Sequence, residues 1–272
     1  MPDPEFDNLI DSLRKAPRQI IYGVVDPSGF GAGRAGGDVF WHMKFSLAAW
    51  ARPDGPVQRS KVQVRRDIED GEFKAYQERL PDYGIVALEV ALLEDSAFWG
   101  PQAWLHAVLD ESPKRDELIR IAEELREPVT TEDQQFGTFT LDRRVNWYEA
   151  QTFWGVNSVC LSLSSDGDDG TFPQNSLAYA RLLWSNQERW DGKIRDYMVA
   201  ELLELKNDSW LDEDESELSR EEFLQRVSLE SVTVGPNGRF EFWYADGDLF
   251  WGHSIMVSGS LDGGLDSADI HG

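Results

Sequence analysis

The sequence predicts an α+β protein built in two parts. Strand-like segments precede two helical segments in the first part, and the second part runs strands, helices, strands, without the alternation of a doubly wound sheet. The chain has 272 residues, enough for two hydrophobic cores. Residues 127–135 are polar and lack periodicity, which is typical of a linker. We therefore expect an N-terminal domain over 1–126 and a C-terminal domain over 136–272.

The N-terminal domain is expected to hold a small, mostly antiparallel sheet and two helices, after a short amphipathic helix at the start of the chain. Its strand segments are rich in β-branched and aromatic residues or alternate between apolar and polar. Pro101 stands where the first turn of a helix tolerates proline. The expected helices are 5–16, 101–109 and 116–125, and the expected strands are 19–25, 38–47, 57–66 and 83–92.

The C-terminal domain is expected to be an antiparallel sheet packed by two or three helices. Ser219-Arg-Glu-Glu222 has the spacing of a capping box and predicts a short helix. Apolar residues at helical spacing predict one buried stripe on the second long helix, namely Ile194, Tyr197, Met198, Leu202 and Leu205. The expected strands are 136–141, 147–153, 158–164, 229–234, 239–245 and 252–258, and the expected long helices are 176–189 and 193–206.

The charge of the chain is strongly negative, with a formal net charge of −24. Residues 1–131 carry 16 basic and 23 acidic side chains, whereas residues 132–272 carry 10 and 27. Such a surface repels phosphate backbones and anionic membranes, so we expect neither nucleic acid nor a membrane as a partner. Basic proteins, polyamines and metal cations are the charged partners that this sign favours. The same charge also suits a protein that is merely soluble.

Several common classes of site have no motif in the sequence. Cys160 is the only cysteine, so no intramolecular disulfide forms. Gly31-Ala-Gly-Arg-Ala-Gly36 matches the dinucleotide fingerprint, but a predicted strand follows it where that site needs a helix. Neither a signal-peptide pattern nor an 18-residue apolar segment occurs, which predicts a cytoplasmic protein. We expect no cofactor, and the absence of common catalytic motifs favours a protein that is not an enzyme.

The segment Asp246-Gly-Asp-Leu-Phe-Trp-Gly-His253 offers two carboxylates and an imidazole on a turn between strands. Asp246 and Asp248, together with Asp262, are candidate ligands of a divalent cation. His253 is a candidate catalytic acid or base at neutral pH. The alternative is turn chemistry, because Asp and Gly adopt the backbone angles that tight turns require.

A second candidate site is a contact surface for a protein. The acidic run contributes Asp212, Glu213, Asp214 and Glu215. The turn contributes Asp246 and Asp248, and Trp210 and Trp251 flank the two segments. Tryptophan beside carboxylates is suited to binding a basic partner. The usual alternative for such an acidic run is a solvated loop.

The aromatic and acidic density of the C-terminal half is distinctive. It is highest over Asp246–Ile255 and Val257–Gly264, and the segments 136–141, 190–197, 203–207 and 240–243 belong to the same pattern. On these segments the chain resembles an uncharacterised bacterial family, catalogued as domain of unknown function 2262, over about its last half. The resemblance implies no catalytic residues. The opening strand is also similar to that of several acidic bacterial domains suspected to be immunity proteins against secreted toxins.

The sequence does not identify a reaction. The preferred hypothesis is a non-enzymatic, acidic, protein-binding protein of the bacterial cytoplasm, of the immunity type, that neutralises a basic toxin domain. The alternative is a metal-dependent enzyme or ligand-binding protein with its site at Asp246, Asp248 and His253.

Overall fold

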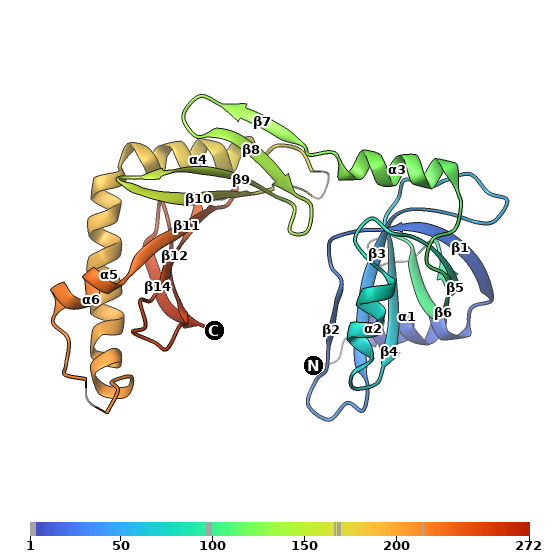
Figure 1. Ribbon diagram of the computed structural model, residues 1–272, viewed down its shortest axis with the longest axis horizontal. Coiled ribbons are helices and arrows are strands. Elements are labelled where there is room, and N and C mark those ends of the chain that lie inside the picture. Colours follow the sequence, from blue (N-terminus) through green and yellow to red (C-terminus); the bar gives the residue numbers. More distant parts are fainter. Residues whose placement is uncertain (1–3, 96–99, 166, 168–169, 214) are drawn as a thin grey trace. The chain divides into compact units, whose positions relative to one another are not determined.

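The computed structural model describes residues 4–95, 100–165, 167, 170–213 and 215–272 (Figure 1). Over these residues the chain forms two compact units, Met1–Pro128 and Val129–Gly272. Each unit has its own β-sheet and its own helices, so the predicted α+β fold is confirmed.

The elements of the N-terminal unit begin with an amphipathic helix, as predicted. The helices are α1 (Pro4–Lys15), α2 (Glu72–Arg79) and α3 (Asp116–Arg126). The strands are β1 (Arg18–Val25), β2 (Gly31–Gly33), β3 (Trp41–Ala51), β4 (Val62–Ile68), β5 (Ile85–Leu93) and β6 (Gln102–Asp110).

The N-terminal sheet closes on itself, because β1 pairs with both β3 and β5. Going round, the order is β1–β3–β4–β6–β5 and back to β1, and β4–β6 is the parallel pair among antiparallel ones. Helix α2 lies between β4 and β5 along the chain. A five-stranded barrel with this order is of the OB type. Alternate residues fill its interior, among them Phe45, Val64 and Leu88.

The predicted helix over 101–109 is wrong, since these residues form strand β6. Ala103 and Leu105 face the core, while Trp104 stands on the opposite side at intermediate exposure. Strand β6 pairs with β4 on one side and β5 on the other. These two ladders satisfy the backbone of β6, and such tertiary pairing outweighs the local signal from Pro101.

The C-terminal unit contains an eight-stranded sheet and three helices in the part of the chain that is described. The helices are α4 (Gln174–Ser185), α5 (Gln187–Ser209) and α6 (Arg220–Arg226). The strands are β7 (Thr130–Asp133), β8 (Gly137–Asp142), β9 (Trp147–Trp154), β10 (Asn157–Ser164), β11 (Ser228–Val234), β12 (Arg239–Ala245), β13 (Ser254–Ser260) and β14 (Gly264–His271).

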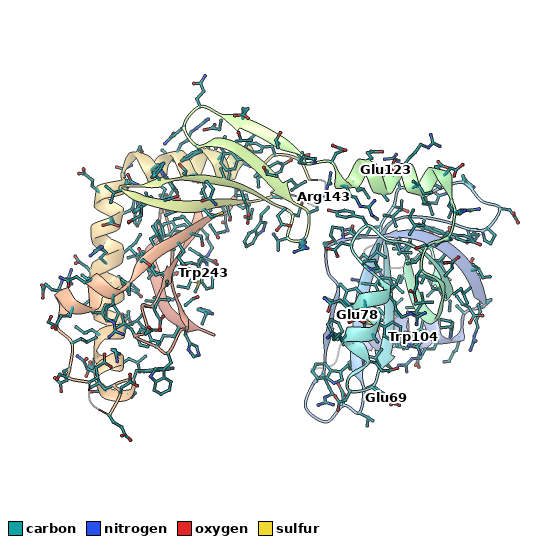
Figure 2. The ribbon with its side chains drawn as sticks, in the orientation of Figure 1. Glu69, Glu78, Trp104, Glu123, Arg143 and Trp243 are labelled. Atoms are coloured by element: carbon teal, nitrogen blue, oxygen red, sulfur yellow. The ribbon has the colours of Figure 1, made fainter. Side chains whose placement is uncertain are left out.

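The C-terminal sheet runs in the order β14–β13–β12–β11–β10–β9–β8–β7, with β10–β11 as its parallel pair. The three helices connect β10 to β11 and pack on one face of the sheet (Figure 1). Met198, Phe223 and Phe242 belong to the core between these layers. Trp243 alternates with the buried Phe242 and Tyr244, so it lies on the opposite face (Figure 2).

Three features of this unit differ from the sequence-based expectation. Strand β7 forms within residues 127–135, which the sequence predicted to be a linker. Strand β14 extends the sheet beyond the last strand that was predicted. On α5 the buried stripe ends at Lys206, which is 1% exposed, while Leu205 is 40% exposed. The buried residues are therefore spaced four apart, and Met198 and Leu202 are followed in this series by Lys206.

Candidate functional site

The turn between β12 and β13 is held together by the side chain of Asp246. This carboxylate is buried and accepts hydrogen bonds from three backbone N–H groups. Its Oδ1 accepts from Asp248 at 3.2 Å, and its Oδ2 accepts from Phe250 at 2.6 Å and from Gly252 at 3.2 Å. These bonds use three of the roughly four acceptor sites of a carboxylate. Asp246 therefore stabilises the turn.

The turn presents Trp251 to solvent. This side chain is 61% exposed, and its backbone has a positive φ of 56°. A bulky residue adopts that conformation only when its surroundings impose it. The ring lies against Trp210, with the ring centroids 4.6 Å apart. Trp210 also contacts the ring of His253 at 5.6 Å. We call Trp210, Trp251 and His253 the tryptophan patch.

The acidic loop after α5 is anchored by Glu215, which faces inward. Its carboxylate binds the buried Nζ of Lys206 and accepts a hydrogen bond from Nη1 of Arg226 at 2.7 Å. Lys206 Nζ also donates to the carbonyl of Trp210 at 2.6 Å. The hydrogen bonds from Lys206 and Arg226 lower the pKa of Glu215 below its usual value. Glu215 therefore fixes the loop beside Trp210.

The same arginine connects this loop to the turn. Arg226 Nε donates to the carbonyl of Gly247 at 3.0 Å. Gly247 has a positive φ of 57°, and a Cβ there would lie 2.3 Å from the carbonyl oxygen of Arg226. The close approach requires glycine. The end of α5, the end of α6 and the β12–β13 turn thus form one continuous structure.

The remaining carboxylates predicted for the contact surface have different positions. Asp212 and Glu213 are exposed on the loop that follows Trp210, and Asp248 is exposed on the turn. Asp214 lies outside the described residues. The predicted contact carboxylates are therefore of two kinds. Asp246 and Glu215 have a structural role, and Asp212, Glu213 and Asp248 are exposed.

The structure does not bring the predicted metal ligands together. In the β12–β13 ladder Ala245 pairs with Ser254 and Arg239 pairs with Ser260. Asp246 follows one end of this ladder and Asp262 follows the other, which separates them by roughly 20 Å. Over the described residues, no group of three or more His, Cys, Asp or Glu side chains is placed to hold a metal ion.

His253 is oriented by the turn itself. Its Nδ1 lies 2.6 Å from the carbonyl oxygen of Phe250, so Nδ1 carries a proton and donates to that oxygen. Its ring packs against Trp210. The carboxylates of its own turn are bonded to backbone, in the case of Asp246, or exposed, in the case of Asp248. The imidazole is thus part of the aromatic cluster.

Sequence reasoning missed Lys206 and Arg226. A signal for Lys206 was present, because the i, i+4 series of Ile194, Met198 and Leu202 continues to position 206. A lysine at the end of such a series needs a buried anion. The sequence placed Glu215 within an acidic run of four residues and did not distinguish it from its neighbours.

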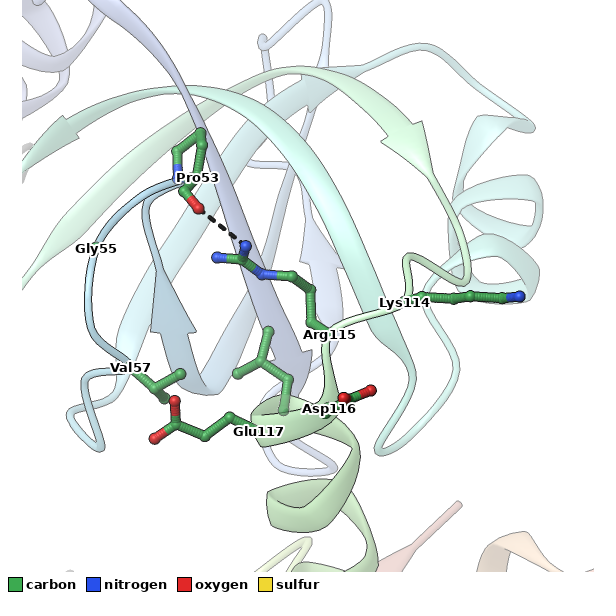
Figure 3. Close-up of a pocket in the computed structure, with 8 residues that line it drawn as sticks. Pro53, Gly55, Val57, Lys114, Arg115, Asp116 and Glu117 are labelled. Carbon is green, nitrogen blue, oxygen red and sulfur yellow. Dashed lines mark hydrogen bonds between the residues drawn. The ribbon is translucent and has the colours of Figure 1, made fainter.

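Two hollows lie on the N-terminal unit. One, of about 330 Å³, is next to the start of α3 (Figure 3). There the Arg115 guanidinium donates to the carbonyls of Pro53 at 2.8 Å and Arg52 at 2.9 Å. Its charge is therefore used to hold the 52–55 turn. The other, of about 920 Å³, lies between α1 and the barrel and is lined by Arg14, His42, Arg65, Asp67 and Trp104.

Comparisons with known proteins identify two family models. The model described as an uncharacterized protein conserved in bacteria, domain of unknown function 2262, matches residues 133–270. The model of domain of unknown function 7021 matches residues 5–125. The resemblance expected from the sequence is thereby confirmed for the C-terminal half. No curated protein matches the chain.

Solved structures that resemble the chain include single-stranded DNA binding proteins. The mitochondrial protein of S. cerevisiae is 14% identical, with a TM-score of 0.24, and the match covers 36% of this chain and 99% of that one. A deletion mutant and the wild type of the Thermus aquaticus protein are 9% and 10% identical, each with a TM-score of 0.23. These matches cover 56% and 54% of this chain, and 77% and 73% of theirs. The scores are too low to support a conclusion.

A membrane-spanning helix is not found among the described residues, where every helix is too short or too polar to cross a bilayer.

Proposed function

The chain belongs to the bacterial family of uncharacterized proteins catalogued as domain of unknown function 2262, a membership that assigns no activity, and we propose that it is a non-enzymatic, immunity-type protein of the cytoplasm that binds a basic protein partner. The observation that supports this most is Trp251. The turn holds this large side chain in an exposed position and at a positive φ. Backbone strain of this kind costs on the order of 1–3 kcal/mol, and residues that carry it cluster at functional sites.

The tryptophan patch has the properties of a binding centre. Rigid aromatic side chains lose little conformational freedom on binding, and tryptophan is enriched among the residues that dominate interface energies. Trp210 supports Trp251 from one side, and Asp246 and Arg226 hold the two segments that carry them. The patch is therefore arranged before a partner arrives, which lowers the entropic cost of association.

The charge around the patch favours a basic partner. Asp212, Glu213 and Asp248 are exposed and lie within three residues of Trp210 or Trp251 in the sequence. The half of the chain that carries them has 27 acidic and 10 basic residues. Complementary charge speeds the encounter of two proteins, while the desolvated aromatic centre slows their separation. A toxin domain that acts on nucleic acid is basic, and it fits this surface.

The test identifies the proteins encoded next to this one in a bacterial genome and measures association of the chain with those that are basic. The Asp212→Lys/Glu213→Lys variant is expected to associate about tenfold more slowly, with a weaker dependence on salt. Trp251→Ala is expected to dissociate faster. The matched control is Asp262→Lys/Asp269→Lys, which makes the same charge change at exposed positions outside the patch. Unchanged binding by the first two variants, or equal slowing by the control, contradicts the proposal.

A further inference from the structure

The face of the C-terminal sheet that points away from α4, α5 and α6 is open. Figure 1 shows β8–β10 at an angle to β11–β14, with α4 and α5 on the outer side of this bend and the open face on its inner side. Ser162 stands on the open face and is nevertheless only 5% exposed. Longer side chains on the neighbouring strands therefore rise above a low floor. A hollow of about 490 Å³ lies over β8 and β9, lined by Thr138, Thr140, Asp142, Glu149 and Gln151 among others.

One row of side chains across this face has a carboxylate at each end and hydroxyl groups between them. Ser162 on β10 is the partner of Glu149 on β9 and of Thr233 on β11. Thr233 is in turn the partner of Glu241 on β12. Paired residues stand on the same face of a sheet, and three strand spacings separate β9 from β12, roughly 14 Å. The two carboxylates therefore stand on either side of a floor of hydroxyl groups.

Neither of these carboxylates has a cation beside it. Both are partly buried, and neither forms an ion pair with a lysine or arginine in the described part of the chain. Glu149 accepts a hydrogen bond from Oγ of Ser162 at 3.4 Å. The eight strands, all of them described, contain no lysine and one arginine, Arg239, whose Nη2 lies 3.0 Å from Oδ2 of Asp266. A partly buried charge is costly without a partner, so this row favours a ligand that brings positive charge to both ends.

An aromatic side chain lies next to one end of the row. Trp243 stands on the same face, two residues after Glu241, and its Nε1 donates to Oε2 of that carboxylate at 3.1 Å (Figure 2). Its ring also contacts the ring of His271, with the centroids 5.1 Å apart. These two contacts fix the indole. Such a ring attracts a cation through its face and packs well against methylene groups.

We propose that this face binds an extended aliphatic diamine or polyamine, with one ammonium at Glu149, another at Glu241, and the methylene chain over Ser162 and Thr233 beside Trp243. An ammonium group donates up to three hydrogen bonds, which suits a carboxylate with hydroxyl groups next to it. The site shares no residue with the tryptophan patch, and the proposal does not depend on the protein-binding function.

Two other cationic ligands fit the row less well. A metal ion binds its oxygen ligands at about 2–2.6 Å, so one ion does not reach both ends of a row that spans roughly 14 Å. A basic peptide added to a sheet binds largely through main-chain hydrogen bonds at an exposed edge. Strands β9 to β12 are instead paired on both sides. A flexible chain with an ammonium at each end meets the geometry directly.

The test is isothermal titration of the full chain with putrescine, spermidine and butylamine at physiological salt, which screens the long-range attraction of a chain with a net charge of −24. Putrescine and spermidine are expected to bind. Butylamine is expected to bind at least about tenfold more weakly than putrescine, because its single ammonium reaches one carboxylate. Glu149→Gln and Glu241→Gln should each weaken putrescine binding by about tenfold or more, to the level of butylamine.

The matched control is Glu188→Gln, which removes the same charge from an exposed position on α5. Glutamine has nearly the shape of glutamate, and thermal unfolding of each variant checks that it remains folded. The proposal is overturned if neither putrescine nor spermidine binds at millimolar concentration, if butylamine binds as tightly as putrescine, or if either row variant binds like the control. A parallel titration with tetralysine tests the peptide alternative: binding of tetralysine alone also overturns the proposal.

Discussion

At the scale of single residues, the role of a carboxylate depends on the groups that surround it in the folded chain. Asp246 and Asp248 stand two positions apart in the same turn. The first is buried and bonded to three backbone N–H groups, and the second is exposed. The sequence predicted both as ligands or contact residues with equal weight. Burial distinguishes the roles of Asp246 and Asp248, because a buried carboxylate requires hydrogen-bond donors nearby.

Replacing Asp246 by Ala should therefore destabilise the C-terminal unit. The variant leaves three N–H groups of the turn without their acceptor, and hydrogen bonds to a charged group are worth about 1.5–3 kcal/mol each. We expect a loss of about 3 kcal/mol or more in the free energy of unfolding, measured with urea. Asp248→Asn is the control, because asparagine also adopts the positive φ of 63° found at this position, and it should change stability by less than about 0.5 kcal/mol. Equal losses in the two variants would show that Asp246 does not hold the turn.

At the scale of elements, regular alternation made strands predictable where one face of a strand is buried. Strand β12 was predicted with the bounds that it has, Arg239–Ala245, because Phe240, Phe242 and Tyr244 alternate with less buried residues. Strand β6 was not predicted, since its apolar run also suits a helix and only its two neighbours decide between them. Strand β14 was missed because its side chains are at best half-buried.

The loop after α5 illustrates how elements are joined by charge. Glu215 receives hydrogen bonds from the end of α5 through Lys206 and from α6 through Arg226. Sequence patterns identify an acidic run, but they do not show that one of its members turns inward. That distinction arises from the buried lysine four residues before Trp210, which requires a counter-charge.

The stability of this junction should depend on pH in the acid range. The pKa of Glu215 is lowered in the folded chain, so its contribution is fully present above the unfolded pKa of about 4.3 and is lost as pH falls through the folded value. Glu215→Gln should cost on the order of 3 kcal/mol near neutral pH, because it leaves Lys206 buried without an anion. Urea unfolding from pH 7 to pH 3 should show that the difference in unfolding free energy between the wild type and Glu215→Gln becomes smaller as the pH falls. A constant difference would contradict the assignment.

At the scale of the whole molecule, the sequence predicted two parts and an uneven distribution of charge, but not the closed barrel. Closure requires β1 to pair with β3 and with β5. Long stretches of chain separate β1 from β3 and from β5, and no local sequence pattern predicts that these strands pair. The hollow between α1 and the barrel was missed for the same reason, because Arg65 and Trp104, which line it, become neighbours only when β4 and β6 align.

Each unit has its own core, which predicts that the C-terminal unit folds by itself. The residues of its core all lie beyond Val129. A fragment over 129–272 should unfold cooperatively, with a midpoint within about 5 °C of the corresponding transition of the full chain. Calorimetry of both proteins measures this. Gradual, non-cooperative melting of the fragment would show that residues 1–128 complete its structure.

The parallel contact between β10 and β11 has a consequence for how the chain reaches its native state. Strands β7–β10 and strands β11–β14 are two meanders whose neighbours are close in sequence, so each forms by short-range contacts. The two meanders meet at this one ladder, and the intervening chain from 165 to 227 carries α4, α5 and α6. Closing a loop of that length has a large entropic cost that grows slowly with length. We therefore expect the rate-limiting step of folding to be the joining of the two meanders, with substitutions at Leu161 and Val232 slowing refolding more than those in β14.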